Sequence, residues 1–279
     1  MPLKSLFTVL TDPALIAPAL DAATVLARKH DAHMDIMCLG VDASQIGYFH
    51  ASASAALVEQ CLARAQDQAA EIRAAVTQHM QGTDVHWSSF IEVAPMADMG
   101  RRIGAEARYG DLAVLPRPYA TGAGGEVEAA AEACLFNGRL PALIIPEDIQ
   151  MPPKPKRIMI AWNDSFEAMS AVRGALPILA EAETVNVVIV DPPVHGPERS
   201  DPGGRVSQFL ARHGMRVEID VLARSMPRVS DVLLRHAVDM DADLMVLGAY
   251  GHSRLREAMF GGATRNLLEQ TRIPLFMAR

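Results

Sequence analysis

Cysteine is scarce in this 279-residue chain, and long apolar runs are missing from it. The three cysteines, Cys38, Cys61 and Cys134, are far apart, and none belongs to a Cys-x-x-Cys pair. This usage argues against a disulfide framework and favours three buried thiols in a reducing compartment, so we predict a cytoplasmic protein. No run approaches the roughly 18 apolar residues that a membrane-spanning helix needs, so we predict no membrane partner.

Clusters of basic residues are also scarce. The formal net charge is −7, and the small group Lys154, Lys156 and Arg157 adjoins a proline-rich segment. Nucleic-acid surfaces need clustered Lys and Arg that release counterions from phosphates. We therefore predict no nucleic-acid partner.

Motifs for catalysis and for metal binding are missing as well. The nine histidines are scattered, and the closest pair, His30 and His33, has no third ligand beside it in the sequence. Neither a phosphate-loop lysine motif nor a nucleophile elbow is present. The sequence therefore predicts no metal site and no catalytic residue.

The chain does contain an internal repeat. Residues 11–18 align with residues 163–170 at an offset of 152, and Asp111 aligns with Asp243 at an offset of 132. The segments Asp111–Leu115 and Asp243–Leu247 are nearly identical in sequence. Two divergent copies explain these matches, and the first copy carries 20 more residues in its middle.

Each copy reads as five strands alternating with helices. In the first copy we predict strands at 4–10, 33–40, 84–91, 111–115 and 140–145, and helices at 13–30, 51–81, 95–108 and 125–137. In the second copy we predict strands at 157–162, 184–190, 215–222, 243–247 and 273–278, and helices at 166–180, 203–213, 228–240 and 262–270. This alternation predicts an α/β fold with a parallel sheet covered on both faces. The domains are expected at 1–147 and 157–279, joined by a proline-rich linker at 148–156.

Glycines mark one stretch of the second copy. The expected strand 243–247 leads into Gly248 and Gly251, and after nine intervening residues Gly261 and Gly262 precede an expected helix. Glycines let a backbone approach a ligand closely, and the N–H groups at a helix start favour an anion such as phosphate. Two loop turns and a helix cap are the alternative interpretation of the same glycines.

The spacing Gly-two-Gly-nine-Gly, with Thr264 shortly after it, resembles the nucleotide signature of the universal stress protein family. The resemblance covers nearly the whole chain as two tandem domains. It implies a flavodoxin-like strand order of 3-2-1-4-5 in each half and a pseudo-twofold pairing of the halves, like a dimer of single-domain members. A homo-oligomer is compatible with it. The family pattern usually has serine where this chain has Gly262.

The resemblance also implies a nucleotide site at the carboxyl ends of the strands. Asn163 stands where nucleotide-binding members usually place aspartate, and it is either a base or ribose contact or a helix cap. Val190 would form one wall for a base, with Leu247 and Gly248 opposite. The phosphates would lie against Gly251, Gly261, Gly262, Ala263 and Thr264.

The first copy lacks the corresponding nucleotide-site residues. Pro116, Pro118 and Tyr119 occupy the positions of the strand-end glycines, and Glu126 and Glu128 would repel a phosphate. We therefore expect a stress-response protein that binds ATP or a related adenine nucleotide weakly in its second half, with at most slow ATP hydrolysis. The alternative is a nucleotide-free tandem scaffold or signalling module that acts through protein partners.

Overall fold

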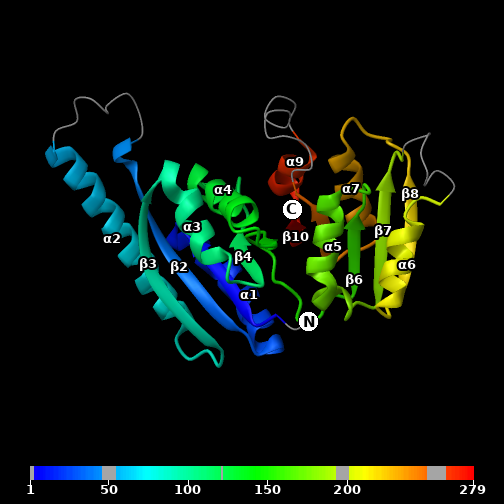
Figure 1. The fold of residues 1–279 in the computed structure, drawn as a ribbon, viewed down its shortest axis with the longest axis horizontal. Helices are drawn as coiled ribbons and strands as arrows, with labels where there is room; N and C mark the ends of the chain where they lie inside the picture. The colour runs from blue at the N-terminus through cyan, green and yellow to red at the C-terminus, as the bar shows by residue number, and fades with distance from the viewer. Residues whose placement is uncertain (1–2, 46–54, 121, 193–200, 250–261) are drawn as a thin grey trace. The chain divides into compact units, whose positions relative to one another are not determined.

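A computed structural model describes residues 3–45, 55–120, 122–192, 201–249 and 262–279. The chain divides into two compact units, Leu3–Gln150 and Met151–Arg279. Each unit contributes five parallel strands. Helices lie on both faces of the strands in each unit (Figure 1). Within the described residues, no helix has both the length and the apolarity to cross a membrane.

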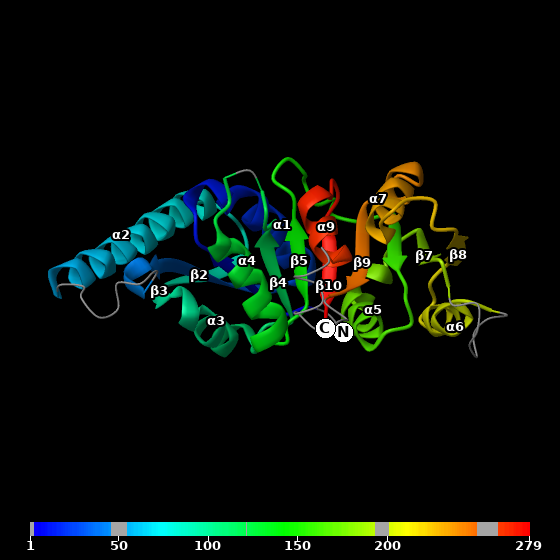
Figure 2. The same ribbon diagram turned by 90° about the horizontal axis from the view of Figure 1, so that it is seen from above.

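The N-terminal unit contains β1 (Ser5–Leu10), α1 (Ile16–His30), β2 (His33–Asp42), α2 (Ala55–Met80), β3 (His86–Pro95), α3 (Met99–Ala107), β4 (Leu112–Pro116), α4 (Gly125–Glu132) and β5 (Ala142–Ile145). Its strand order is β3-β2-β1-β4-β5, all parallel. Helices α1 and α2 cover one face of this sheet, and α3 and α4 cover the other (Figure 2).

The C-terminal unit contains β6 (Arg157–Ala161), α5 (Phe166–Leu179), β7 (Thr184–Val190), α6 (Gly204–Arg212), β8 (Val217–Leu222), α7 (Val229–Asp239), β9 (Leu244–Gly248), α9 (Ala263–Gln270) and β10 (Leu275–Ala278). Its strand order is β8-β7-β6-β9-β10, again all parallel. Both units therefore have the order 3-2-1-4-5 in their own chain direction, which confirms the predicted flavodoxin-like fold.

The repeat is visible in side-chain contacts as well as in topology. The Oδ2 atom of Asp111 accepts hydrogen bonds from the backbone N–H groups of Lys4 and Ser5, at 2.7 and 2.9 Å. Asp243 makes the same pair of bonds to Lys156 and Arg157, also at 2.7 and 2.9 Å. In each unit, one aspartate thus joins the start of the first strand to the start of the fourth.

The largest departure from the sequence prediction is at the end of β3. We predicted a helix from residue 95, but β3 continues to Pro95 and α3 begins at Met99 after a short 3₁₀ turn, Met96–Asp98. The physical reason is the length of β2, whose last residues, Leu39–Asp42, pair with Glu92–Pro95. Sheet pairing therefore overrides the local helix pattern there.

The cysteines are not all buried, so the prediction of three buried thiols was wrong for one of them. Cys38 in β2 and Cys134 after α4 are fully buried, whereas Cys61 in α2 is half-buried. Desolvation by burial raises the pKa of Cys38 to about 11 and that of Cys134 to about 12. Both therefore remain neutral thiols near pH 7.

Candidate functional site

The carboxyl ends of β6 and β9 form the topological switch point of the C-terminal sheet. Ala161, the last residue of β6, pairs with Leu247 of β9. Helices α5 and α6 cover the face on one side of these strands, and α7 and α9 cover the other face (Figure 2). In an open parallel sheet, chain segments diverge at this point and leave a crevice that ligands use.

The loop after β6 is ordered by its own side chains. The Oδ1 atom of Asn163 accepts a hydrogen bond from the N–H of Ser165 at 3.2 Å, and Ser165 Oγ accepts one from the N–H of Ala168 at 3.1 Å. Asp164, between them, adopts the left-handed region with φ 57°. Asn163 thus forms the turn before α5, whose N-cap is Ser165, and the Asn163 side chain is exposed at the carboxyl edge.

Gly248 ends β9 against the first turn of α5. A Cβ atom at this position would lie 2.5 Å from the backbone nitrogen of Ala168 and 2.7 Å from the carbonyl carbon of Glu167. Both are backbone atoms of a helix and cannot move alone, so only glycine fits here. Leu247, just before it, is 4% exposed, and Val190 at the end of β7 is half-buried.

Helix α9 begins at the same edge as the end of β9, because it runs back across the sheet between the parallel strands β9 and β10. Gly262 is its N-cap residue, with φ −54° and ψ 151°, and supplies no side-chain cap. Ala263 is exposed, and Thr264 is 6% exposed. Gly251 and Gly261, the other two glycines of the motif, lie outside the described residues.

A buried amide fixes the start of α9 against α7. Asn266 is 3% exposed, and its Nδ2 donates to Ser230 Oγ and to Asp231 Oδ1, each at 2.8 Å. Its Oδ1 accepts from Arg228 Nη1 at 3.0 Å and from Gln270 Nε2 at 2.8 Å. The hydrogen-bonding capacity of this amide is therefore fully used within the protein.

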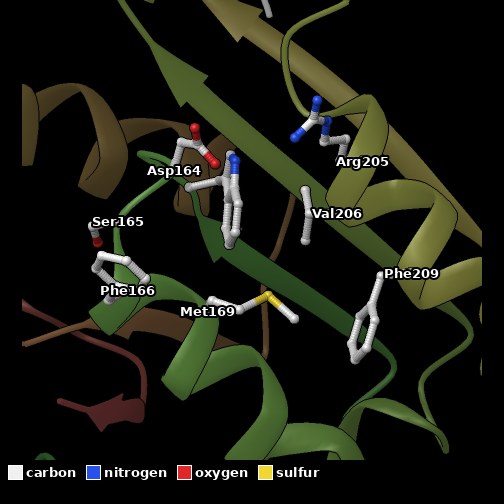
Figure 3. A pocket seen from close by; sticks show the side chains of 8 residues that line it. Asp164, Ser165, Phe166, Met169, Arg205, Val206 and Phe209 are labelled. Atoms are coloured by element: carbon white, nitrogen blue, oxygen red, sulfur yellow. The ribbon is translucent and has the colours of Figure 1, made fainter.

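A cleft of about 320 Å³ lies between α5 and α6, on the face of the sheet beside β6 and β7. Figure 3 shows the side chains that line it. They are Trp162, Asp164, Ser165, Phe166, Met169, Arg205, Val206 and Phe209. Sequence reasoning missed this cleft, because Met169, Val206 and Phe209 at helical spacing resemble ordinary core residues.

Comparison with known protein families finds a match in the C-terminal unit. Residues 154–279 match the model of the universal stress protein family. The C-terminal unit is therefore similar to the universal stress protein family. A universal stress protein from Synechocystis sp. is 26% identical over 164 residues, which are 56% of this chain and 52% of the relative. The chain thus spans about half the length of that curated relative.

Solved universal stress proteins share the fold of the whole chain. A universal stress protein from Archaeoglobus fulgidus DSM 4304 superposes with a TM-score of 0.74, at 11% identity, over 99% of this chain and 96% of that one. A functionally unknown protein from Pseudomonas aeruginosa PAO1 superposes with a TM-score of 0.59, at 17% identity, over 99% and 92%. At these identities, the likeness concerns the fold alone.

In the N-terminal unit, a side chain of the protein itself joins the ends of β1 and β2. Gln68 of α2 donates from Nε2 to the carbonyl oxygen of Thr11 at 2.9 Å and accepts at Oε1 from the N–H of Val41 at 3.5 Å. The first turn of α4 carries Glu126 and Glu128. These carboxylates oppose an anion at that helix start.

Within the described residues, no group of three or more His, Cys, Asp or Glu side chains is placed to hold a metal ion. The polar cluster around Asn266 holds α9 against α7, and the Asn266 amide itself has no donor or acceptor left for a ligand.

Proposed function

We propose that this protein is a stress-response protein whose C-terminal unit binds ATP or a related adenine nucleotide weakly. The observation that carries the proposal is the start of α9 at Gly262, which has no side-chain cap and lies at the carboxyl edge of the sheet. Backbone N–H groups at a helix start attract phosphate through hydrogen bonding and through the helix dipole. The family match over residues 154–279 supports the placement of this proposed site in the C-terminal unit.

The base and the ribose would lie across the ends of β6 and β7 in this proposal. Asn163 is exposed there, and although its oxygen is engaged by Ser165, its amide nitrogen can donate to a ligand. Val190 offers a half-buried apolar wall at the end of β7. The proposed arrangement gives a few backbone contacts and one amide, and we therefore expect weak binding. We propose no catalytic residue.

A nucleotide-free scaffold that acts through protein partners is the second candidate. The observation that favours it is the packing of Gly248, because the contact with Ala168 and Glu167 requires a glycine there even without a ligand. The hydrogen bond that Asn163 accepts from Ser165 similarly gives Asn163 a role in the turn before α5 without a ligand. The two candidates differ in one measurable respect, which is whether adenine nucleotides bind at all.

Gly262→Ser is expected to tighten ATP binding roughly 10- to 100-fold, since a hydrogen bond to a charged group is worth about 1.5–3 kcal/mol. The new hydroxyl would face the phosphates from the N-cap of α9. Titration calorimetry of the wild type and the variant with ATP, ADP and AMP measures the change.

Gly124→Ser is the matched control for that experiment. Gly124 is the N-cap residue of α4, likewise without a side-chain cap, and the three atoms nearest to an added Cβ all belong to the flexible side chain of Glu126. Serine at this position should leave ATP affinity unchanged. If neither the wild type nor Gly262→Ser gives heat with any of the three nucleotides at about 1 mM, the scaffold candidate replaces the nucleotide proposal.

A further inference from the structure

The cleft between α5 and α6 shares no residue with the proposed nucleotide edge. Its lining comes from the loop after β6, from the first turns of α5 and from α6. Its volume of about 320 Å³ is at the small end of the range for ligand pockets, which suits a compact molecule better than a nucleotide.

The inner part of this cleft is apolar. Trp162 is 8% exposed and Val206 is 3% exposed, and Met169 and Phe209 complete the lining between the two helices (Figure 3). The ring of Phe209 packs on the ring of His213, with 4.7 Å between the ring centroids. This contact restricts the orientation of the Phe209 ring. Aromatic and thioether groups of this kind favour a planar, apolar ligand group.

Two opposite charges stand at one end of the cleft. Figure 3 shows Asp164 on the α5 side and Arg205 on the α6 side, with Met169 and Phe209 toward the other end. A ligand with a single charge would be attracted by one of these groups and repelled by the other. A ligand whose polar end carries both charges complements both of them.

We propose that this cleft binds a free α-amino acid with an aromatic side chain. Its ammonium group faces Asp164, its carboxylate faces Arg205, and its ring enters the apolar part between Met169 and Phe209. Phe166 at the rim is 92% exposed and offers the ring a further contact as it enters. The cleft adjoins the proposed nucleotide edge, because Trp162 and Asp164 flank Asn163 and the N–H of Ser165 donates to Asn163 Oδ1.

The chain supplies its own reporter for this test. Its two tryptophans are Trp87, in β3 of the N-terminal unit, and Trp162, in the cleft. In a Trp87→Phe protein, the fluorescence of Trp162 is expected to change saturably with L-phenylalanine below about 10 mM. Calorimetry of the unaltered protein with L-phenylalanine gives the same constant without the substitution.

Charge variants then test the assignment. Asp164→Asn keeps a residue that tolerates the left-handed backbone, and Arg205→Gln removes the positive charge from α6. Each is expected to weaken L-phenylalanine binding roughly 10-fold. Arg212→Gln is the control, since Arg212 is an exposed residue of the same helix outside the cleft, and it should bind as the wild type does.

Analogues that carry a single charge test whether both charges of the ligand are needed for binding. Phenethylamine and 3-phenylpropionate each lack one charge of the amino acid and should bind more weakly than L-phenylalanine. The proposal is overturned if no saturable binding appears by about 10 mM, if both charge variants bind as the wild type does, or if either analogue binds as tightly as the amino acid.

Discussion

Gly40→Ala is expected to destabilise the N-terminal unit by about 3 kcal/mol. Gly40 lies in β2, where α2 crosses the strand closely. A Cβ atom there would overlap the carbonyl oxygen of Ala65 and would lie 2.7 Å from its carbonyl carbon and 3.2 Å from the Cβ of Ala69. Because the first two are backbone atoms of α2, relief requires the helix to move away from the sheet. That movement also separates Gln68 from Thr11 and Val41.

Urea unfolding followed by Trp87 fluorescence in a Trp162→Phe background reports on this unit alone, since Trp87 lies in β3. Gly125→Ala is the matched control, because an added Cβ at Gly125 would meet nothing within 4 Å. It should change the unfolding free energy by less than about 1 kcal/mol. Equal effects of the two substitutions would contradict the close approach of α2 to β2.

Asn266→Ala is expected to destabilise the C-terminal unit by about 3 kcal/mol. The substitution removes four hydrogen bonds from a site that is 3% exposed. It leaves the hydroxyl of Ser230, which is fully buried, without this partner, and it opens a cavity between α7 and α9. Leaving a buried polar group without its partner costs more free energy than the hydrogen bond contributes to stability.

Gln270→Ala is the graded comparison for that substitution. Gln270 is exposed and contributes one of the four bonds to the same amide, so its loss should have an effect of less than about 1 kcal/mol. Urea unfolding followed by Trp162 in the Trp87→Phe background measures both variants. If Asn266→Ala were no more harmful than Gln270→Ala, the network would not be what holds the start of α9 in place.

Much of the fold could be predicted from the sequence, because the repeat and the alternation of strands and helices are local properties. Asp111 and Asp243 aligned in the sequence, and each joins the first and fourth strands of its own unit in the structure. The extension of β3 to Pro95 could not be predicted, since it depends on pairing with residues about 53 positions earlier. How the two halves pack together remains a prediction.

The candidate site was harder to predict, because its residues have more than one physical reason to be there. The sequence suggested Gly248 as a point of ligand approach, yet its packing against Ala168 also requires glycine. Asn163 was interpreted equally as a ligand contact and as a cap, and the structure shows that Ser165 is the N-cap of α5, while Asn163 accepts a hydrogen bond from Ser165 in the turn before the helix. The contacts of Gln68 and the cleft beside Trp162 depend on how helices lie over the sheet, which periodicity does not specify.

Photo-crosslinking with 8-azido-ATP, followed by peptide mass spectrometry, tests the central claim most directly, because it locates the nucleotide on the chain. The account predicts adducts in peptides that contain Val190 or Leu247, suppressed by excess unlabelled ATP. Adducts confined to residues 3–150, or labelling that unlabelled ATP does not suppress, would contradict it.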